Sequence, residues 1–177
     1  AINGMIYMRG HPGDYDEWAE MGNRGWAFAD VLPYFKKSEN NETFGENPFH
    51  GAGGPLNVTD LARRNPLVQV FLEATDSLQL PRRADFNAED QEGFGTRQVT
   101  MRDGRRESTA TAFLKPARGR PNLTIVTGAL ADRVVLEGGR ATGVVLGGDG
   151  RTIAAAREVV LAAGAIGSPA LLMRSGI

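Results

Sequence analysis

The sequence predicts an α+β fold, in which helices dominate the first two thirds of the chain and strands dominate the last third. Three observations support this prediction. Amphipathic helical patterns come first, short runs of Val, Ile, Leu and Thr between glycine-rich turns follow, and a last strand-like run leads through glycines into an apolar helix. The 177 residues, of which 41% are hydrophobic, are enough to bury a core.

Two helices are predicted near the start of the chain. Residues 14–21 place Tyr15, Trp18 and Ala19 on one face. Residues 28–39 form a second helical pattern, with lysines near its C-terminal end. Pro33 is expected in the first turn of that helix, since proline in a helix interior removes a backbone hydrogen bond.

A third helix is predicted after Asn65, which is a typical N-cap residue, with Pro66 at the first helical position. Apolar residues then recur at intervals of three and four positions. They predict one buried helix face, made of Leu67, Val70, Phe71, Ala74 and Leu78.

The middle of the chain predicts a strand, a turn and a short helix. Residues 96–101 are strand-like, and Asp103 followed by Gly104 indicates a tight turn. Residues 108–118 are predicted to begin as a helix that Pro116 breaks.

The last third is predicted to be a β-meander that ends in a strand, a turn and a helix. The predicted strands are residues 123–127, 133–137, 141–146 and 158–163. The last helix is expected to be capped by Ser168, with Pro169 at its first position and Gly176 at its end.

Composition excludes several classes of function. The 20 basic and 21 acidic residues give a net charge of −1, which argues against nucleic acid or an anionic membrane as partner. There is no apolar run of membrane-spanning length. The absence of cysteine excludes disulfides, and with only two histidines we expect no metal site.

Single residues and short motifs do not identify a reaction. The stretch GAIGS, residues 164–168, fits either an ordinary strand–turn–helix or a turn that faces a nucleotide. Each histidine, His11 and His50, is expected to lie in a loop and make one hydrogen bond, and Arg9 is expected at the surface. The tryptophans, Trp18 and Trp26, are expected in the core.

Seven segments in order carry a resemblance to a known family. They are AINGMIYMRG, DYDEWAEMGNRGWAFADVLPYFKKSE, HGAGGPLNV, DFNAEDQEGFG, GRRESTATAFLKPARGRPNLTIVTGA, ATGVV and GAIGSPALLMRSGI. Together they resemble the glucose–methanol–choline (GMC) family of FAD-dependent oxidoreductases, especially its choline-dehydrogenase-like bacterial members. The last segment is similar to the second sequence signature of that family.

The resemblance implies an incomplete GMC oxidoreductase fold and an internal part of a longer enzyme. Residues 1–60 would form the flavin-covering loop and the following helices of the FAD-binding domain. Residues 61–120 would form part of the substrate-binding domain, and residues 121–177 the meander and strand–turn–helix of the FAD-binding domain. The GxGxxG unit and the catalytic histidine region of the family have no counterpart here, so we expect no catalytic residue in this chain.

The resemblance also implies an activity and a cofactor. Family members move a hydride from an alcohol to flavin N5, which gives an aldehyde or ketone. We expect FAD to bind non-covalently, because Ile2 stands where some members carry the linking histidine. The residues expected to contact FAD are Asn3, Gly4 and Met5 at the flavin ring, Ala131 at the adenine, and Ala163 and Gly164 near the adenosine part.

The expected partner is a small-molecule alcohol, and the expected location is the cytoplasm. Uncovered sheet edges of an incomplete domain would favour pairing with a second copy. We expect the isolated chain to be inactive, because it lacks the catalytic base and half of the cofactor site. The alternative is a naturally shortened, non-catalytic scaffold or binding module derived from this family.

Overall fold

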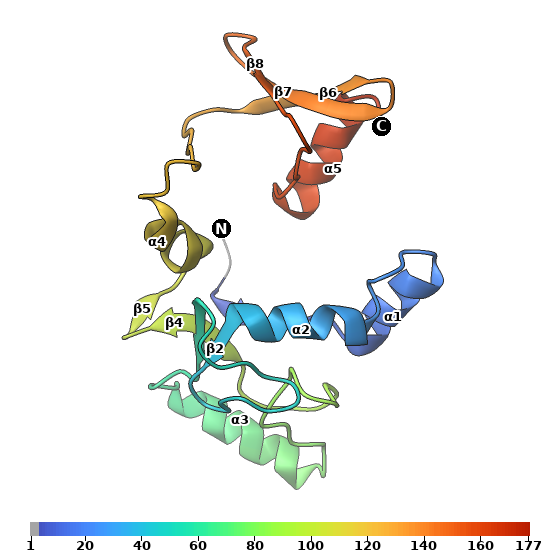
Figure 1. The fold of residues 1–177 in the computed structure, drawn as a ribbon. Helices are drawn as coiled ribbons and strands as arrows, with labels where there is room; N and C mark the ends of the chain where they lie inside the picture. Colours follow the sequence, from blue (N-terminus) through green and yellow to red (C-terminus); the bar gives the residue numbers. More distant parts are fainter. Residues whose placement is uncertain (1–3) are drawn as a thin grey trace. The chain divides into compact units, whose positions relative to one another are not determined.

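The computed structural model describes residues 4–177, which divide into two compact units, one ending at Arg120 and one covering Pro121–Ile177 (Figure 1). Helices and strands are mixed along the chain, as the sequence predicts. Within the described residues, no helix is both long enough and apolar enough to cross a membrane.

The first unit begins with a two-residue strand and two helices. Strand β1 is Ile6–Tyr7, α1 is Pro12–Glu20 and α2 is Phe28–Ser38. Both predicted helices are confirmed, but the placement of Pro33 was wrong, because this proline is the sixth residue of α2. A proline there removes one hydrogen bond to the preceding turn, which the rest of the helix tolerates.

The expectation that both tryptophans lie in the core was also wrong. Trp18 is 45% exposed and Trp26 is 52% exposed, and their rings contact each other edge to face with centroids 5.9 Å apart. Trp18 lies on α1 and Trp26 lies in the connection between α1 and α2, whereas the buried apolar residues of the sheet are β-branched, as at Val58 and Val99.

In the described part of the first unit, five strands form one sheet in the order β1-β4-β3-β2, with β5 paired to the end of β4. The further strands are β2 (Glu39–Asn41), β3 (Leu56–Thr59), β4 (Gln98–Arg102) and β5 (Arg105–Arg106). Strand β2 runs parallel to β3, while β4 is antiparallel to both β1 and β3. The sheet therefore joins segments that are far apart in the sequence.

The predicted turn at Asp103 and Gly104 is confirmed as the two-residue connection of the β4–β5 hairpin. Both residues have positive φ, 51° and 72°, which is the conformation that fits the twist of a tight hairpin. The following helix differs from the expectation, because it runs through Pro116 to Ala117. Residues Ala110–Leu114 form a wide π-helical turn, η1, and the short helix α4, Lys115–Ala117, begins just before the proline, where a backbone donor is not needed.

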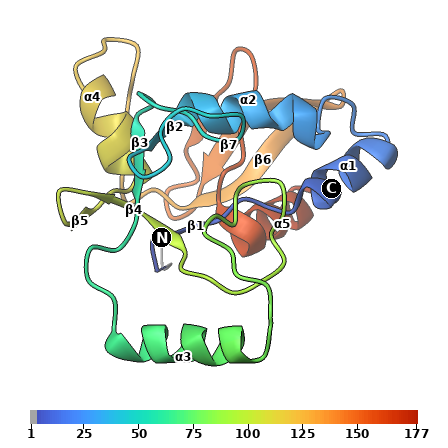
Figure 2. The same cartoon turned by 90° about the horizontal axis from the view of Figure 1, so that it is seen from below.

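Helix α3, Pro66–Ser77, begins as predicted at Asn65, whose side chain accepts the Leu67 N–H at 3.0 Å. Its predicted buried face was wrong. Leu67, Val70, Phe71 and Leu78 are 57% to 72% exposed, while Leu72 and Thr75 are the buried residues of this helix. Helix α3 lies at the margin of the first unit, so only one narrow side of it meets other residues (Figure 2).

The second unit is a three-stranded antiparallel meander, among the residues described, with one helix. The strands are β6 (Ala131–Glu137), β7 (Arg140–Leu146) and β8 (Thr152–Ala154), and the helix is α5 (Gly164–Arg174). The turn between β6 and β7 is formed by Gly138 and Gly139, both with positive φ. The buried apolar residues of this unit come from two of the strands and from α5: Val134, Val145, Leu146 and Leu171.

Two of the four predicted strands were wrong. Residues 123–127 and 158–163 have strand composition, but in the described chain neither pairs with a strand, and a strand needs a neighbour for its backbone hydrogen bonds. Strand β8 was missed because Thr152–Ala154 is only three residues long.

The start of the last helix was also predicted wrongly. Helix α5 begins at Gly164, so Ser168 and Pro169 lie inside it. The Ser168 hydroxyl oxygen accepts the Ala163 N–H at 3.0 Å, which satisfies a donor that precedes the helix. The predicted end is confirmed, because Gly176 follows the helix with a φ of 84°.

Candidate functional site

The first expected flavin contacts lie just before strand β1. Gly4 is exposed, and among the described residues a side chain added at its α-carbon would meet only the Ile6 side chain, at 3.8 Å. Met5 has a φ of 66°, which is unusual for a residue with a side chain. The Met5 carbonyl accepts the Thr100 N–H at 2.8 Å and faces the Thr100 hydroxyl at 3.4 Å. The other expected residues of this loop, Ile2 and Asn3, lie outside the described residues.

A buried asparagine fixes the segment that follows. Asn87, only 4% exposed, accepts the Arg9 N–H at 2.7 Å and donates its side-chain N–H to the Tyr7 carbonyl at 3.2 Å. Because one side chain bridges two backbone groups two residues apart, the end of β1 is held in a single conformation.

The expectation that Arg9 is a surface residue was wrong. Its guanidinium donates to Glu39 Oε2 at 2.7 Å and to the Phe49 carbonyl at 2.6 Å, and both charged side chains are almost fully buried. The guanidinium also lies over the rings of Tyr7 and Phe35, at 5.7 and 5.2 Å from their centroids. Burial is tolerated because the charge is both paired and hydrogen-bonded.

His50 lies in a loop, as expected, but the expected single hydrogen bond was wrong, because the ring is fully buried between two carboxylates. Its Nδ1 lies 3.0 Å from Glu39 Oε1, and its Nε2 lies 2.7 Å from Asp85 Oδ2. Burial alone would lower the pKa of His50, but the hydrogen bonds and charges of Asp85 and Glu39 outweigh it and raise the pKa to about 9. The ring is therefore a cation at neutral pH and donates from both nitrogens.

The neighbouring amides agree with a protonated ring. The Asn41 side-chain nitrogen lies within 3.0 Å of Glu39 Oε1, Gln98 Oε1 and His50 Nδ1. An amide nitrogen has two hydrogens, and when Nδ1 carries a proton only the two oxygens are acceptors. The two hydrogens of the Asn41 amide then match the two acceptor oxygens, Glu39 Oε1 and Gln98 Oε1.

The two carboxylates are held ionised by the same contacts. Burial tends to raise the pKa of Glu39, but its hydrogen bonds from His50, Asn41 and the Gly51 N–H lower the pKa overall. For Asp85, burial is likewise outweighed by the hydrogen bonds from His50 and the Asn87 N–H, and the pKa is lowered. We call Arg9, Glu39, His50 and Asp85 the buried ion cluster.

Glycines after His50 let the backbone approach this cluster. A side chain at Gly51 would overlap the Lys36 carbonyl, and a side chain at Gly54 would come 2.5 Å from the Glu39 carbonyl oxygen. The HGAGG segment therefore packs directly against the end of α2 and the start of β2. This close approach explains the glycine spacing, which from the sequence indicates only a loop.

No local signal could have revealed the ion cluster. His50 is 11 residues from Glu39 and 35 from Asp85 in the sequence, and Arg9 is 30 residues from Glu39. Spacings of this kind predict no contact, because only the sheet of the first unit brings the segments together.

The remaining expected FAD contacts lie in the second unit, which is described by itself. The Ala131 carbonyl faces the Arg174 guanidinium at 3.4 Å, near the C-terminal end of α5. Ala163 and Gly164 lie at the other end of that helix, whose 11 residues span ~16 Å. Ala131, on β6, therefore lies near the C-terminal end of α5, whereas Ala163 and Gly164 lie at its N-terminal end.

The chemistry at these positions fits parts of FAD. Gly164 has a φ of 85° and no described atom near the place of a β-carbon, so the backbone there is accessible. Among the described residues no side chain caps the N-terminus of α5, which leaves backbone donors for negatively charged or polar groups of a nucleotide. The bare backbone of Gly4 suits close contact with a flat ring.

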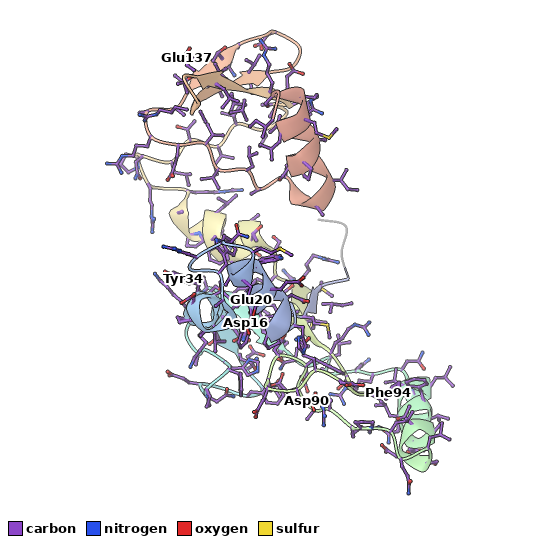
Figure 3. The ribbon with its side chains drawn as sticks, turned by 90° about the vertical axis from the view of Figure 1, so that its right-hand side faces the viewer. Asp16, Glu20, Tyr34, Asp90, Phe94 and Glu137 are labelled. Atoms are coloured by element: carbon purple, nitrogen blue, oxygen red, sulfur yellow. The ribbon has the colours of Figure 1, made fainter. Side chains whose placement is uncertain are left out.

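An apolar pocket and a metal centre are two other kinds of site that could be considered in this chain. A cavity of about 560 Å³ in the first unit has mostly apolar walls, formed by Tyr15, Gly25, Trp26, Val31, Tyr34, Phe35 and Ser38. Tyr34 lies on α2, whereas Asp16 and Glu20 lie on α1 (Figure 3). In the described part of the chain, no group of three or more His, Cys, Asp or Glu side chains could hold a metal ion.

Comparison with known proteins identifies the family. Residues 1–177 match the GMC oxidoreductase family, so this chain belongs to it. It is 51% identical over 179 residues to an oxygen-dependent choline dehydrogenase of Brucella anthropi, a match that covers 100% of this chain and 32% of that protein. The chain thus spans about a third of the length of the curated relatives it matches.

Solved structures show the same fold. Pyridoxine 4-oxidase from Mesorbium loti matches with a TM-score of 0.88 and 42% identity, over 99% of this chain and 35% of that one. An FAD-dependent oxidoreductase from Chaetomium thermophilum matches with a TM-score of 0.84 and 29% identity, over 99% of this chain and 33% of that one. The expected GMC oxidoreductase fold, present in part, is confirmed.

Proposed function

We propose that this chain is part of a flavin-dependent alcohol dehydrogenase or oxidase that converts an alcohol to an aldehyde or ketone. The match of every residue to the GMC oxidoreductase family carries this proposal. The relatives support an alcohol as substrate, because their names include choline dehydrogenase and pyridoxine 4-oxidase. Choline-like alcohols are the first substrates to test, since the choline dehydrogenases share about half of the residues.

The proposed cofactor is FAD, bound without a covalent link. FAD, when bound, supplies the atom that accepts the hydride. Gly4 and Met5, with Asn3, would lie along the flavin ring, where backbone N–H groups or the Asn3 amide stabilise negative charge on the reduced ring. Ala131, Ala163 and Gly164 would contact the adenosine part. Ile2 offers no nucleophile for a covalent bond.

The chain alone is proposed to lack a catalytic base, and its two histidines support this. The His11 ring accepts the Gly13 N–H at 3.1 Å and caps helix α1. The ring nitrogens of His50 face the buried Glu39 and the partly buried Asp85, and the pKa of His50 is raised to about 9, so it cannot take a further proton at neutral pH. We therefore propose that the base belongs to another part of the whole enzyme.

The assignment of residues 1–60, 61–120 and 121–177 to FAD-binding, substrate-binding and FAD-binding domains remains part of this proposal. So does a cytoplasmic location. Pairing of copies through sheet edges is a further part, and the exposed edge strand β8, with Ile153 44% exposed, is the candidate edge.

The first experiment titrates FAD with the purified 177-residue chain and follows quenching of flavin fluorescence. Saturable quenching at micromolar protein, weakened by Asn3→Ala or Gly164→Val, would support the assigned contacts. The same titration and an assay with choline and other alcohols should then use the protein expressed from the complete reading frame that contains these residues. If that protein neither binds FAD nor oxidises any alcohol, the non-catalytic scaffold is the better interpretation.

A further inference from the structure

We propose that His50 is a positioning residue for the flavin-facing segment Gly4–Arg9, which it holds through two separate arms that both start at its ring. This inference rests on the proposed function, in which Gly4 and Met5 lie against FAD. His50 is not proposed as a catalytic residue, because its ring is fully buried and each ring nitrogen is paired with a carboxylate.

The first arm runs from Nδ1 of His50 through Glu39 to Arg9. Glu39 Oε1 accepts a hydrogen bond from His50 Nδ1 at 3.0 Å, and Glu39 Oε2 accepts one from the Arg9 guanidinium at 2.7 Å. The Gly51 N–H also donates to Oε2, at 3.0 Å, so the carboxylate cannot rotate without losing a partner. The side chain of Arg9 is thereby fixed at one end of the segment.

The second arm runs from Nε2 of His50 through Asp85 to Asn87. Asp85 Oδ2 accepts a hydrogen bond from His50 Nε2 at 2.7 Å, and Asp85 Oδ1 accepts one from the Asn87 N–H at 2.8 Å. Asn87 in turn holds the Arg9 N–H and the Tyr7 carbonyl. The same ring therefore fixes both the side chain and the backbone of the segment.

The segment leads directly to the residues proposed to face FAD. Ile6 and Tyr7 pair with Val99 and Gln98 of strand β4, and Met5 is held by the backbone N–H of Thr100. A two-residue strand pairs weakly by itself. The side-chain arms are therefore needed to keep Gly4 and Met5 in one position, which is what a close backbone contact to a ring requires.

The test compares variants of the protein expressed from the complete reading frame. His50→Gln removes the second donor nitrogen and the positive charge, whereas His11→Asn changes an exposed histidine and keeps an N-cap acceptor. We expect His50→Gln to raise the dissociation constant of FAD about tenfold, because the contact residues lose their fixed position. We also expect a changed visible circular dichroism spectrum of the bound flavin at saturating FAD, with His11→Asn unchanged in both.

A second variant tests the path without disturbing a buried charge. Asn87→Ala removes the two hydrogen bonds that the Asn87 side chain makes to the Arg9 N–H and the Tyr7 carbonyl. The ion pairs among Arg9, Glu39, His50 and Asp85 remain. The proposal requires Asn87→Ala to shift FAD affinity and the flavin spectrum in the same direction as His50→Gln. Far-ultraviolet circular dichroism shows whether each variant is folded.

The outcomes are distinct. If the unchanged protein does not bind FAD, the proposed function fails. If it binds FAD and both folded variants keep its flavin spectrum and affinity within twofold, the positioning role of His50 is wrong. If His50→Gln does not fold, the FAD affinity and flavin spectrum of Asn87→Ala decide whether the positioning role stands. If neither variant folds, the cluster supports the whole unit and the specific positioning role is rejected.

Discussion

His50 Nδ1 lies 3.0 Å from Glu39 Oε1, and both side chains are completely buried in the first unit. The pair is joined by Arg9 on one side and Asp85 on the other, so two cations alternate with two carboxylates. Buried charges of this kind are tolerated only while every partner is present. The stability of this unit should therefore depend on pH and on each member of the cluster.

The first prediction concerns alkaline pH. The pKa of His50 is about 9 in the folded protein against 6.5 for an unperturbed histidine side chain, so its ion pairs stabilise the fold fully below pH 6.5. This contribution, about 3 kcal/mol, should be lost as the pH rises through about 9. The free energy of unfolding in urea at pH 6, 8 and 9.5 measures it, and His50→Gln should flatten the decline whereas His11→Asn should not.

The second prediction concerns acid pH and has the opposite sign. The pKa values of Glu39 and Asp85 are lowered from 4.5 and 3.8, so their contributions are present above these values and are lost as the pH falls below them. Urea unfolding between pH 6 and pH 3 should therefore show a steep loss of stability. Constant stability down to pH 3 would contradict the buried pairing of these carboxylates.

The third prediction removes one carboxylate charge. Glu39→Gln leaves Arg9 and His50 buried without their shared anion and should destabilise the chain by about 3 kcal/mol. The pKa of His50, followed by NMR titration, should also fall. Asp149→Asn is the matched control, since the Asp149 side chain is 64% exposed and 3.9 Å from Arg151, and it should change stability by less than about 0.5 kcal/mol.

The fourth prediction concerns the close backbone contact after His50. Gly51→Ala should destabilise the chain by about 3 kcal/mol, because the new side chain would overlap the Lys36 carbonyl and force the backbone to move. Gly119→Ala introduces the same group where no atom lies within 4 Å of it. Thermal unfolding should separate the two variants, and equal melting temperatures would show that the HGAGG segment does not pack as described.

The fifth prediction tests which side of helix α3 is buried in this chain. Leu72→Ala should cost about 3 kcal/mol, because Leu72 is 4% exposed and its removal leaves a cavity. Val70→Ser, on the exposed side, should change the free energy of unfolding by less than about 0.5 kcal/mol. A larger loss for Val70→Ser than for Leu72→Ala would restore the burial pattern expected from the sequence.

Phe71 illustrates why the periodic pattern failed there. The ring centroids of Phe71 and Phe94 are 6.0 Å apart, and Phe94 is labelled beside α3 in Figure 3. Even so, 57% of the Phe71 surface is exposed. Periodicity predicts that a helix has an apolar face. It does not say whether other residues cover that face, which depends on the tertiary neighbours.

Features that depend on neighbours along the chain could be predicted from the sequence. The cap formed by Asn65 and Pro66 and the turn at Asp103 and Gly104 follow from local hydrogen bonding and from the φ angles that each residue allows. The hairpin at Gly138 has the same origin. The ordered motifs also indicated the GMC oxidoreductase family, to which the chain belongs.

The burial of Arg9 and His50 and the partners of Asp85 depend on the tertiary structure. These contacts join residues 30 and 35 positions apart, and no spacing rule relates them. The tertiary structure also places residues 158–163 outside any strand in the described chain, because pairing depends on a neighbouring strand and not on composition. Local sterics act through adjacent residues, whereas burial and charge pairing arise only when the sheet brings distant segments together.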